Sequence, residues 1–471
     1  MINTKTIEDA IFSRCVEANT TLPDDIFAKL LQAYNSEENS EAKQTLGLIL
    51  TNAKMAYEKK MPLCQDTGQV LVFVKGKCFP EGLNDAINKG VERAYEDNFY
   101  RKSVVKNALF NRTNTKTNAP CVIYTEITDK DGLELEVLIK GAGSENVSVI
   151  EMLSPTSTED EILEFIVSAV EKAGSKACPP YFLGIGIGGT IEYAGLLSKK
   201  ALLLEKNIDA QHENLATKIK KAINDLNIGA AGFGGASTAL DVKILTGFTH
   251  IACMPVAVTI NCHSSRHAKC TINESNDIVG RAYQPDNINH RAKFDAVGLV
   301  SPTYYTDFIK VNTSDIEQLK LLKQGQNVLL SGEIYTARDM AHKRLLDLIK
   351  KGESLPFDIK NSIIFYAGPC PCTGNCIVGS IGPTTSSRMD KFAPALYEKG
   401  VLATIGKGER SEQCKASIKE TGGLYFSLIG GIACYLSEKF VKKELIAFED
   451  LGAEAIYKFE VKDLPLRLDF C

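Results

Sequence analysis

A polar, turn-rich stretch at residues 272–306 interrupts the chain and separates two regions that carry regular hydrophobic patterns. The stretch contains many Asn and Asp residues together with Pro, and neither helical nor strand periodicity continues through it. With 471 residues, the chain is also long for one domain. We therefore predict a larger first domain at 1–285, a linker at 286–306 and a second domain at 307–471.

Helical and strand-like patterns alternate on both sides of this stretch, which predicts an α+β (mixed α/β) fold. Two strand-like runs, 121–127 and 133–139, flank Asp129-Lys-Asp-Gly and predict a β-hairpin. The glycine-rich run 183–190 lacks the spacing of a dinucleotide-binding loop. It favours a strand whose glycines allow another backbone to approach closely.

Charge and hydropathy exclude several classes of function. Lys and Arg number 54 against 58 Asp and Glu, so the bulk positive charge of a nucleic-acid-binding protein is absent. The longest apolar runs fall short of the roughly 18 residues that span a membrane. The N-terminus shows no basic region followed by an apolar core. We therefore expect no nucleic-acid partner, no membrane partner and a cytoplasmic location in which thiols stay reduced.

The 14 cysteines are the part of the composition that indicates chemistry. Cys64, Cys178 and Cys262 lie at the ends of predicted elements, where side chains from distant segments can converge. Taken singly, each is more simply explained as a small, buried apolar residue. Cys262 could also join His263 and His267 in a zinc site, although no fourth ligand lies nearby in the sequence.

Cys370, Cys372 and Cys376 form the densest cysteine group. Their spacing does not match the Cys-x2-Cys pattern of common metal sites, and three ligands would need another from elsewhere. The sequence therefore leaves two alternatives open: an auxiliary metal site, or a loop with incidental thiols.

Three cations of the second domain suggest a small-anion site. Arg388 ends the loop Gly382-Pro-Thr-Thr-Ser-Ser-Arg, and Arg338 and Lys407 lie in other short motifs. The planar guanidinium group suits a carboxylate or phosphate. Each of the three taken alone is typical of an ordinary surface charge.

Longer motifs resemble a known family. Residues 62–69 (Pro-Leu-Cys-Gln-Asp-Thr-Gly-Gln), Cys178-Pro-Pro and Met254-Pro-Val-Ala-Val with Cys262-His resemble the larger part of class I fumarate hydratases and L-tartrate dehydratases. Four further segments resemble the smaller part of that family: 332–344, 366–369, 379–390 and 405–408. In many members the alpha-type and beta-type parts are separate chains, so the resemblance implies that they are fused here.

The resemblance implies a 4Fe–4S cluster with three cysteine ligands, which match Cys64, Cys178 and Cys262. An iron without a protein ligand acts as a Lewis acid rather than an electron carrier. The implied reaction is the reversible hydration of fumarate to L-malate, as in the tricarboxylic acid cycle, and the implied assembly is a homodimer.

The resemblance also assigns roles at an active site expected between the two domains. Thr384 matches the catalytic base and Asp66 its acid partner. The substrate is a small C4 dicarboxylate, and the positions that match its binding residues are Gln65, Arg101, Gly143, His250, Arg338, Arg388 and Lys407.

Several alternatives stay open. Hydration of mesaconate or dehydration of L-tartrate uses the same chemistry and differs only in pocket contacts. A non-catalytic iron–sulfur sensor would bind the cluster without turnover, and a zinc-dependent lyase would use Cys262 and His267. The loop that begins at Gly368 departs from the family's Gly-Pro-Thr-Pro pattern, and its cysteines match no ligand position.

Overall fold

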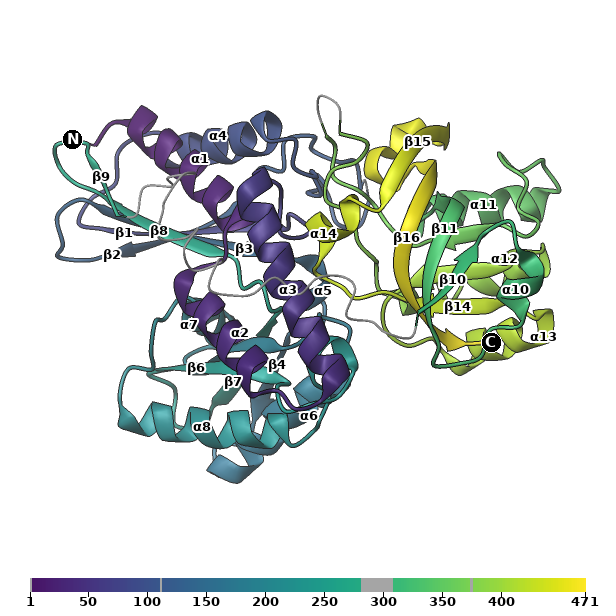
Figure 1. Ribbon diagram of the computed structural model, residues 1–471. Coiled ribbons are helices and arrows are strands. Elements are labelled where there is room, and N and C mark those ends of the chain that lie inside the picture. Colours follow the sequence, from purple (N-terminus) through teal and green to yellow (C-terminus); the bar gives the residue numbers. More distant parts are fainter. Residues whose placement is uncertain (1, 111, 281–307, 373–375) are drawn as a thin grey trace. The chain divides into compact units, whose positions relative to one another are not determined.

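The computed structural model describes residues 2–110, 112–280, 308–372 and 376–471, and its fold is mixed α/β, as the sequence predicts (Figure 1). The chain divides into two compact units, 1–299 and 300–471. The linker predicted at 286–306 lies outside the described residues.

Unit 1 begins with three helices, α1 (Thr4–Thr20), α2 (Asp24–Ser36) and α3 (Ser40–Lys59). The side chains of Asn3 and Asn39 cap α1 and α3 by accepting hydrogen bonds from backbone N–H groups of the first turn. Helix α1 packs with α4 (Leu83–Asp97) against the first sheet, and their apolar faces form one core with its strands (Figure 1).

The first sheet has the strand order β2-β1-β3-β8-β9. The strands are β1 (Gln69–Gly76), β2 (Val122–Ile127), β3 (Leu133–Lys140), β8 (His267–Ile272) and β9 (Ile278–Val279). The predicted hairpin is wrong, because β1 lies between β2 and β3, parallel to the former and antiparallel to the latter. Strand β1 is almost entirely buried and needs a partner on each edge, a pairing that local turn signals do not reveal.

The second sheet of unit 1 has the order β4-β7-β5-β6. Its strands are β4 (Val149–Leu153), β5 (Tyr181–Gly188), β6 (Ala239–Gly247) and β7 (Met254–Asn261), and its helices are α6 (Glu159–Ala173), α7 (Ile191–Ala201) and α8 (Ala210–Asn224). A Cβ at Gly186 would lie 2.1 Å from the carbonyl oxygen of Ala194, and one at Gly184 would lie 2.0 Å from that of Ser198. The prediction of a strand with close backbone approach is therefore confirmed.

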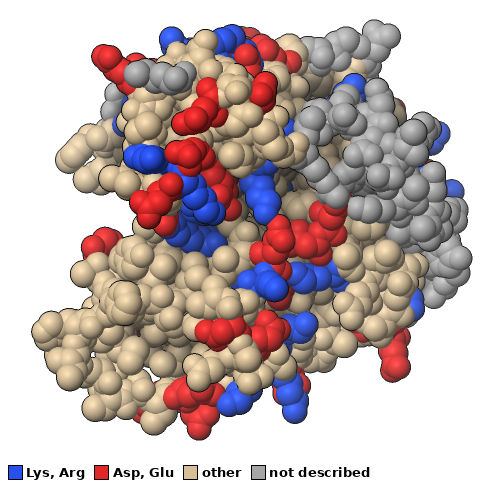
Figure 2. Space-filling view, turned by 90° about the vertical axis from the view of Figure 1, so that its left-hand side faces the viewer, with Lys and Arg blue, Asp and Glu red and all other residues tan. Residues whose placement is uncertain are grey.

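Charged side chains of both signs intermingle on the side of the molecule that Figure 2 shows, and no broad area of one sign appears there. In unit 1, Lys75 on β1 pairs with Glu134 and Glu136 on β3, and Lys200 on α7 pairs with Glu126 on β2. Among the described residues, no helix combines the length and the apolar character that crossing a membrane requires.

Unit 2 contains a mixed sheet with the order β10-β11-β12-β13-β14-β16-β15. The strands are β10 (Phe308–Asn312), β11 (Asn327–Thr336), β12 (Ile363–Phe365), β13 (Ala403–Gly406), β14 (Leu424–Ser427), β15 (Phe440–Ala447) and β16 (Ile456–Phe470). The α-helices are α10 (Ile316–Lys320), α11 (Asp339–Lys351), α12 (Ala393–Glu398), α13 (Glu412–Thr421) and α14 (Ala433–Ser437). Strands β10 to β14 run parallel, so the loops after their carboxyl ends gather at one edge of the sheet.

Candidate active site

The loop between α3 and β1 carries three of the predicted site residues: Cys64, Gln65 and Asp66. Both ends of this loop are fixed by buried contacts. Leu63 donates its N–H to the carbonyl oxygen of Asn19 at 2.8 Å, and its own carbonyl accepts from the side chain of Asn52 at 3.0 Å. At the other end, Gly68 has φ +69°, and a Cβ there would lie 2.7 Å from the carbonyl oxygen of Lys140, so only glycine fits.

The Asp66 carboxylate is held by three donors. Its Oδ2 accepts from the N–H of Ala142 at 2.8 Å, and its Oδ1 accepts from the N–H of Gly68 at 3.1 Å. The Arg101 guanidinium lies 3.1 Å from Oδ1 in an ion pair that is largely shielded from solvent. The sequence placed Asp66 and Arg101 in one site, and the structure brings them into contact.

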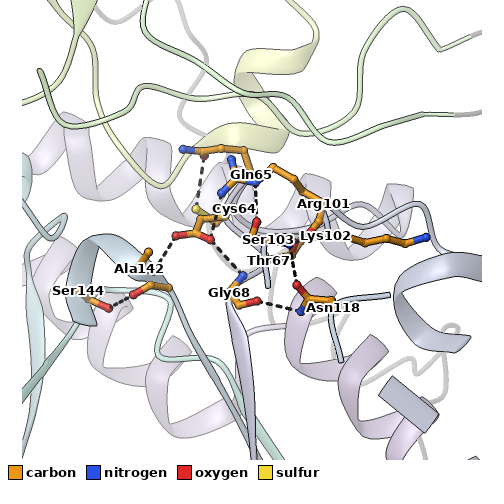
Figure 3. A network of polar contacts seen from close by, with 12 residues as sticks. Cys64, Gln65, Thr67, Gly68, Arg101, Lys102, Ser103, Asn118, Ala142 and Ser144 are labelled. Atoms are coloured by element: carbon orange, nitrogen blue, oxygen red, sulfur yellow. Dashed lines mark hydrogen bonds and ion pairs between the residues drawn. The ribbon is translucent and has the colours of Figure 1, made fainter. Parts of the chain in front are cut away.

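Arg101 is itself tied to the loop that it faces (Figure 3). Its carbonyl oxygen accepts from the Thr67 hydroxyl at 2.6 Å, and its Nε donates to the Ser103 hydroxyl at 3.3 Å. Asn118 joins both segments, because it accepts from the N–H of Ser103 at 2.8 Å and donates to the carbonyl of Gly68 at 3.1 Å. The Asp66–Arg101 pair therefore stands on a rigid support rather than on a free surface loop.

The three cysteines predicted as ligands come from three connections of unit 1 and lie close enough to influence one another. Burial raises the pKa of the Cys64 thiol to about 12; the Arg266 cation opposes this shift, while Asp66, Cys262 and Cys178 add to it. Cys178 and Cys262 are also joined through the backbone, because the N–H of His263 donates to the carbonyl of Cys178 at 3.3 Å. All three cysteines are intermediate in exposure as whole residues.

Two cations near these thiols were not singled out in the sequence. Arg266 is buried; it donates to the side chain of Asn19 at 3.2 Å, and its Nε has no hydrogen-bond partner among the described residues. Lys140 is buried and donates to the Ser144 hydroxyl and the Ile260 carbonyl, both at 2.7 Å. Burial lowers the pKa of the Lys140 ammonium to about 7. A basic residue close to Cys-His-Ser-Ser was the one available signal for Arg266.

The other predicted residues of unit 1 occupy different surroundings. Gly143 lies in the short helix α5 (Ala142–Glu145), next to the Ala142 N–H that binds Asp66. Gln65 is buried next to Cys64. The side-chain oxygen of Gln65 lies 3.4 Å from the Cys64 thiol. His250 is exposed between β6 and β7, and its Nδ1 accepts from the N–H of Ala252 at 3.1 Å. No contact described in unit 1 joins His250 to the Asp66 network.

The predicted arginines of unit 2 lie beside two acidic residues, Asp339 at the start of α11 and Glu454. Arg388 contacts Asp339 through two nitrogens, at 3.1 and 2.5 Å. Arg338 lies 3.8 Å from the same carboxylate and 3.5 Å from Glu454. The two guanidinium groups predicted to bind an anion are therefore brought together by Asp339.

Thr384 and Lys407 lie on adjacent backbone segments of unit 2. Thr384 is buried; its N–H donates to the carbonyl of Tyr366 at 2.6 Å, and its carbonyl accepts from the N–H of Lys407 at 3.2 Å. The N–H of Ser386 in turn donates to the carbonyl of Lys407 at 2.9 Å. Backbone hydrogen bonds thus join the loop that carries Thr384 and Arg388 to the loop that carries Lys407.

Neither histidine beside Cys262 completes a site for a single metal ion. His267 uses its Nδ1 in a 2.8 Å contact with the carbonyl of Ser265, and burial lowers the pKa of its ring. Cys372 and Cys376 direct their thiols to the carbonyl oxygens of Cys376 and Val378, at 3.0 and 2.9 Å. In the described parts of the chain, no three His, Cys, Asp or Glu residues are grouped so as to hold one ion.

Comparisons with known proteins match most of the chain. The family described as fumarate hydratase (fumerase) matches residues 8–271, and the one described as fumarase C-terminus matches residues 287–469. The putative class I fumarate hydratase of Geobacillus stearothermophilus is 30% identical over 97% of this chain and 92% of its own length. The anaerobic class I fumarate hydratase of Escherichia coli is 30% identical over 92% and 82%. The putative L(+)-tartrate dehydratase subunit alpha of Methanocaldococcus jannaschii is 39% identical, over 56% of this chain and 96% of its own length.

Proposed function

Because the chain belongs to the fumarate hydratase family, we propose that it is a hydro-lyase that interconverts fumarate and L-malate. The observation that carries the proposal is the Asp66–Arg101 pair, which stands on a fixed loop next to Cys64. A carboxylate can transfer a proton, and a guanidinium can bind a substrate carboxylate. Their pairing beside a potential metal ligand therefore suits acid–base chemistry on a carboxylate substrate.

We propose further that Cys64, Cys178 and Cys262 hold a 4Fe–4S cluster. The donors fit such a group, since three thiols from separate connections lie near one another and the buried Arg266 can offset negative charge beside Cys64. Thiolates of a cluster bind different iron atoms and so stand farther apart than the ligands of one ion, which suits a donor set that forms no single-ion site in the described residues. When bound, the cluster supplies a Lewis acid at the iron that no cysteine ligates.

The cationic side chains bind and orient the substrate in this proposal. Fumarate and malate carry two carboxylates, and a guanidinium can bind a carboxylate through two parallel hydrogen bonds. Arg101 in unit 1 and Arg338 and Arg388 in unit 2 already lie beside acidic partners, which hold their side chains in place. Lys407 provides a fourth positive charge.

Dehydration of malate also needs a base that removes a proton from carbon. We assign this role to Thr384, with Asp66 as its acid partner. A threonine hydroxyl has a pKa far above neutral, so the base needs cations that stabilise its anionic form. Arg388 and Lys407 lie on the two backbone segments that hold Thr384.

The test is an anaerobic reconstitution followed by an iron and sulfide count and rate measurements on the same sample. We expect sulfide with the iron and turnover of fumarate above that of L-tartrate and mesaconate. Strong tartrate turnover with negligible fumarate turnover would favour the alternative that the Methanocaldococcus relative suggests. A loaded cluster without any hydration would favour the sensor. We also propose a cytoplasmic homodimer serving the tricarboxylic acid cycle, which size-exclusion chromatography and cell fractionation can test.

A further inference from the structure

A charged guanidinium is buried in the core of unit 2. The Arg410 side chain is 1% exposed and contacts Asp390 at 2.6 Å, an ion pair that compensates its charge. One terminal nitrogen donates to the hydroxyls of Thr404 at 3.1 Å and Tyr366 at 3.3 Å, and the other contacts the Cys414 thiol at 2.9 Å. A buried charge with this many partners is expensive to maintain unless its surroundings are well ordered.

Two tyrosines enclose this guanidinium. Its central carbon lies 5.4 Å from the ring centre of Tyr366 and 5.0 Å from that of Tyr425, which are cation–π distances. The Tyr425 hydroxyl is hydrogen-bonded to the carbonyl oxygen of Gly408 at 2.6 Å and to the Ser386 hydroxyl at 2.9 Å. We call Arg410, Tyr366 and Tyr425 the arginine core.

The arginine core contacts both segments that carry predicted site residues, the threonine loop (383–390) and the lysine loop (406–411). Tyr366 accepts the N–H of Thr384 through its carbonyl oxygen, and Asp390 ends the threonine loop at the guanidinium. Tyr425 bonds one residue in each loop, Ser386 and Gly408. The arginine core therefore links the threonine loop to the lysine loop through buried side chains.

The loops approach each other too closely for their spacing to be incidental. A Cβ at Gly406 would lie 1.9 Å from the Ser386 hydroxyl oxygen, so the lysine loop can pass Ser386 only because residue 406 is glycine. Loss of the Tyr425 hydroxyl contacts would remove the side-chain link between Ser386 and Gly408. The backbone hydrogen bonds of Lys407 with Thr384 and Ser386 would then hold the two loops without that support.

We propose that Arg410, acting through Tyr366 and Tyr425, is a positioning residue that fixes Thr384 against Lys407. This inference rests on the proposed function, because it gives those two residues a role in turnover. Arg410 itself touches no reacting atom.

A purely structural role for the arginine core is the competing explanation, and Tyr397 provides the matched control. Tyr397 is also buried in unit 2, and its hydroxyl also makes two hydrogen bonds, to Thr404 at 2.7 Å and to the Leu424 carbonyl at 2.9 Å. Both partners belong to the strands β13 and β14, and neither lies in the two loops. Thr404 also accepts from Arg410, so the Tyr397 hydroxyl shares one partner with the arginine core but bonds neither loop. Tyr397→Phe and Tyr425→Phe thus remove equivalent hydroxyls that differ in what they hold.

The experiment compares both variants as reconstituted holoenzyme. We expect similar losses of thermal stability, and a kcat on fumarate that falls by about tenfold to a hundredfold in Tyr425→Phe alone, since small misplacements of reacting groups cost that much. Arg410→Lys keeps the charge beside Asp390 but loses the planar guanidinium that contacts Thr404, Tyr366 and Cys414. Its kcat should fall at least as far as that of Tyr425→Phe. Equal kcat values for the two tyrosine variants would overturn the proposal.

A second readout keeps this inference separate from the proposed function. Hydrogen exchange of the wild-type protein and both variants reports loop order whether or not fumarate is a substrate. We expect faster exchange in peptides covering 383–390 and 406–411 in Tyr425→Phe and unchanged exchange in Tyr397→Phe. Loop protection that stays intact in Tyr425→Phe would refute the arginine core as a positioning device, even if the protein hydrates nothing.

Discussion

Replacing Asp66 by asparagine tests the centre of the candidate site with a minimal change of shape. In the native loop, Oδ1 accepts from Gly68 and Arg101 while Oδ2 accepts from Ala142. An amide that keeps its oxygen toward Gly68 and Arg101 must point its NH2 group at the Ala142 N–H, so two donors face each other. The flipped amide points its NH2 group at both the Gly68 N–H and the Arg101 guanidinium, which leaves more donors without an acceptor.

The cost follows from these contacts. A hydrogen bond to a charged group contributes about 1.5–3 kcal/mol, and an unsatisfied donor costs about 1–3 kcal/mol. Water can reach part of this site, so we expect Asp66→Asn to lower the free energy of unfolding of unit 1 by about 1–3 kcal/mol. Loss of the acid partner should reduce fumarate turnover by about 10²-fold or more.

Asp241→Asn is the matched control. Asp241 lies in the same unit, and its side chain is 18% exposed, as is that of Asp66. It pairs with Lys29 at 2.6 Å and Lys243 at 3.2 Å but takes no part in the candidate site. Denaturant unfolding and steady-state kinetics should show comparable stability losses with turnover lost only in Asp66→Asn. A near-native rate in Asp66→Asn, or activity that simply tracks stability in both variants, would refute the role of Asp66.

Three further predictions address the ligands, the base and the buried lysine. Cys64→Ser, Cys178→Ser and Cys262→Ser should each lose bound iron and sulfide after reconstitution, whereas Cys372→Ser should keep both; an essential Cys372 beside a dispensable Cys178 would contradict the ligand set. Thr384→Val should keep the iron and sulfide content but lose about 10²-fold or more in kcat. The neighbouring Thr385→Val serves as the control, and equal rates in the two variants would contradict Thr384 as the base. The pKa of Lys140 falls to about 7 on folding, so the unfolded chain binds more protons between that pH and the ordinary lysine pKa, and stability should rise with pH across this window. Lys140→Met should flatten that rise in urea titrations at several pH values, and an unchanged slope would show that folding does not lower the pKa of Lys140.

The sequence predicts those parts of the fold that depend on local chemistry. The glycines of β5 have one physical explanation, close backbone approach, and that run was predicted as a strand. The hairpin prediction failed because strand order depends on which edges of β1 need partners, and that requirement involves residues far apart in the chain. Turn residues at 129–132 describe a connection but not the strands that it passes.

The candidate site divides in the same way. Cys64, Asp66 and Arg101 were assigned to one site through the family resemblance, whereas the contact between Asp66 and Arg101 could not be predicted from the sequence. The burial of Arg266 and Lys140 has no sequence signature, since their partners include a side chain of α1 and a backbone carbonyl of β7. A charged residue inside a strand or at its end looks the same in the sequence whether it faces water or a protein oxygen.

The predicted substrate-binding arginines share one property that bears on how a dianion would bind. Arg101 pairs with Asp66, Arg388 with Asp339 and Arg338 with Glu454, so none depends on substrate to neutralise its charge. Each pair holds a long side chain in one orientation, which removes part of the entropy that a flexible arginine would lose on binding. The acidic partners also weaken the attraction for a carboxylate, so binding energy is exchanged for orientation. Substrate affinity should therefore be modest, and removal of Asp339 should strengthen anion binding while loosening the geometry on which turnover depends.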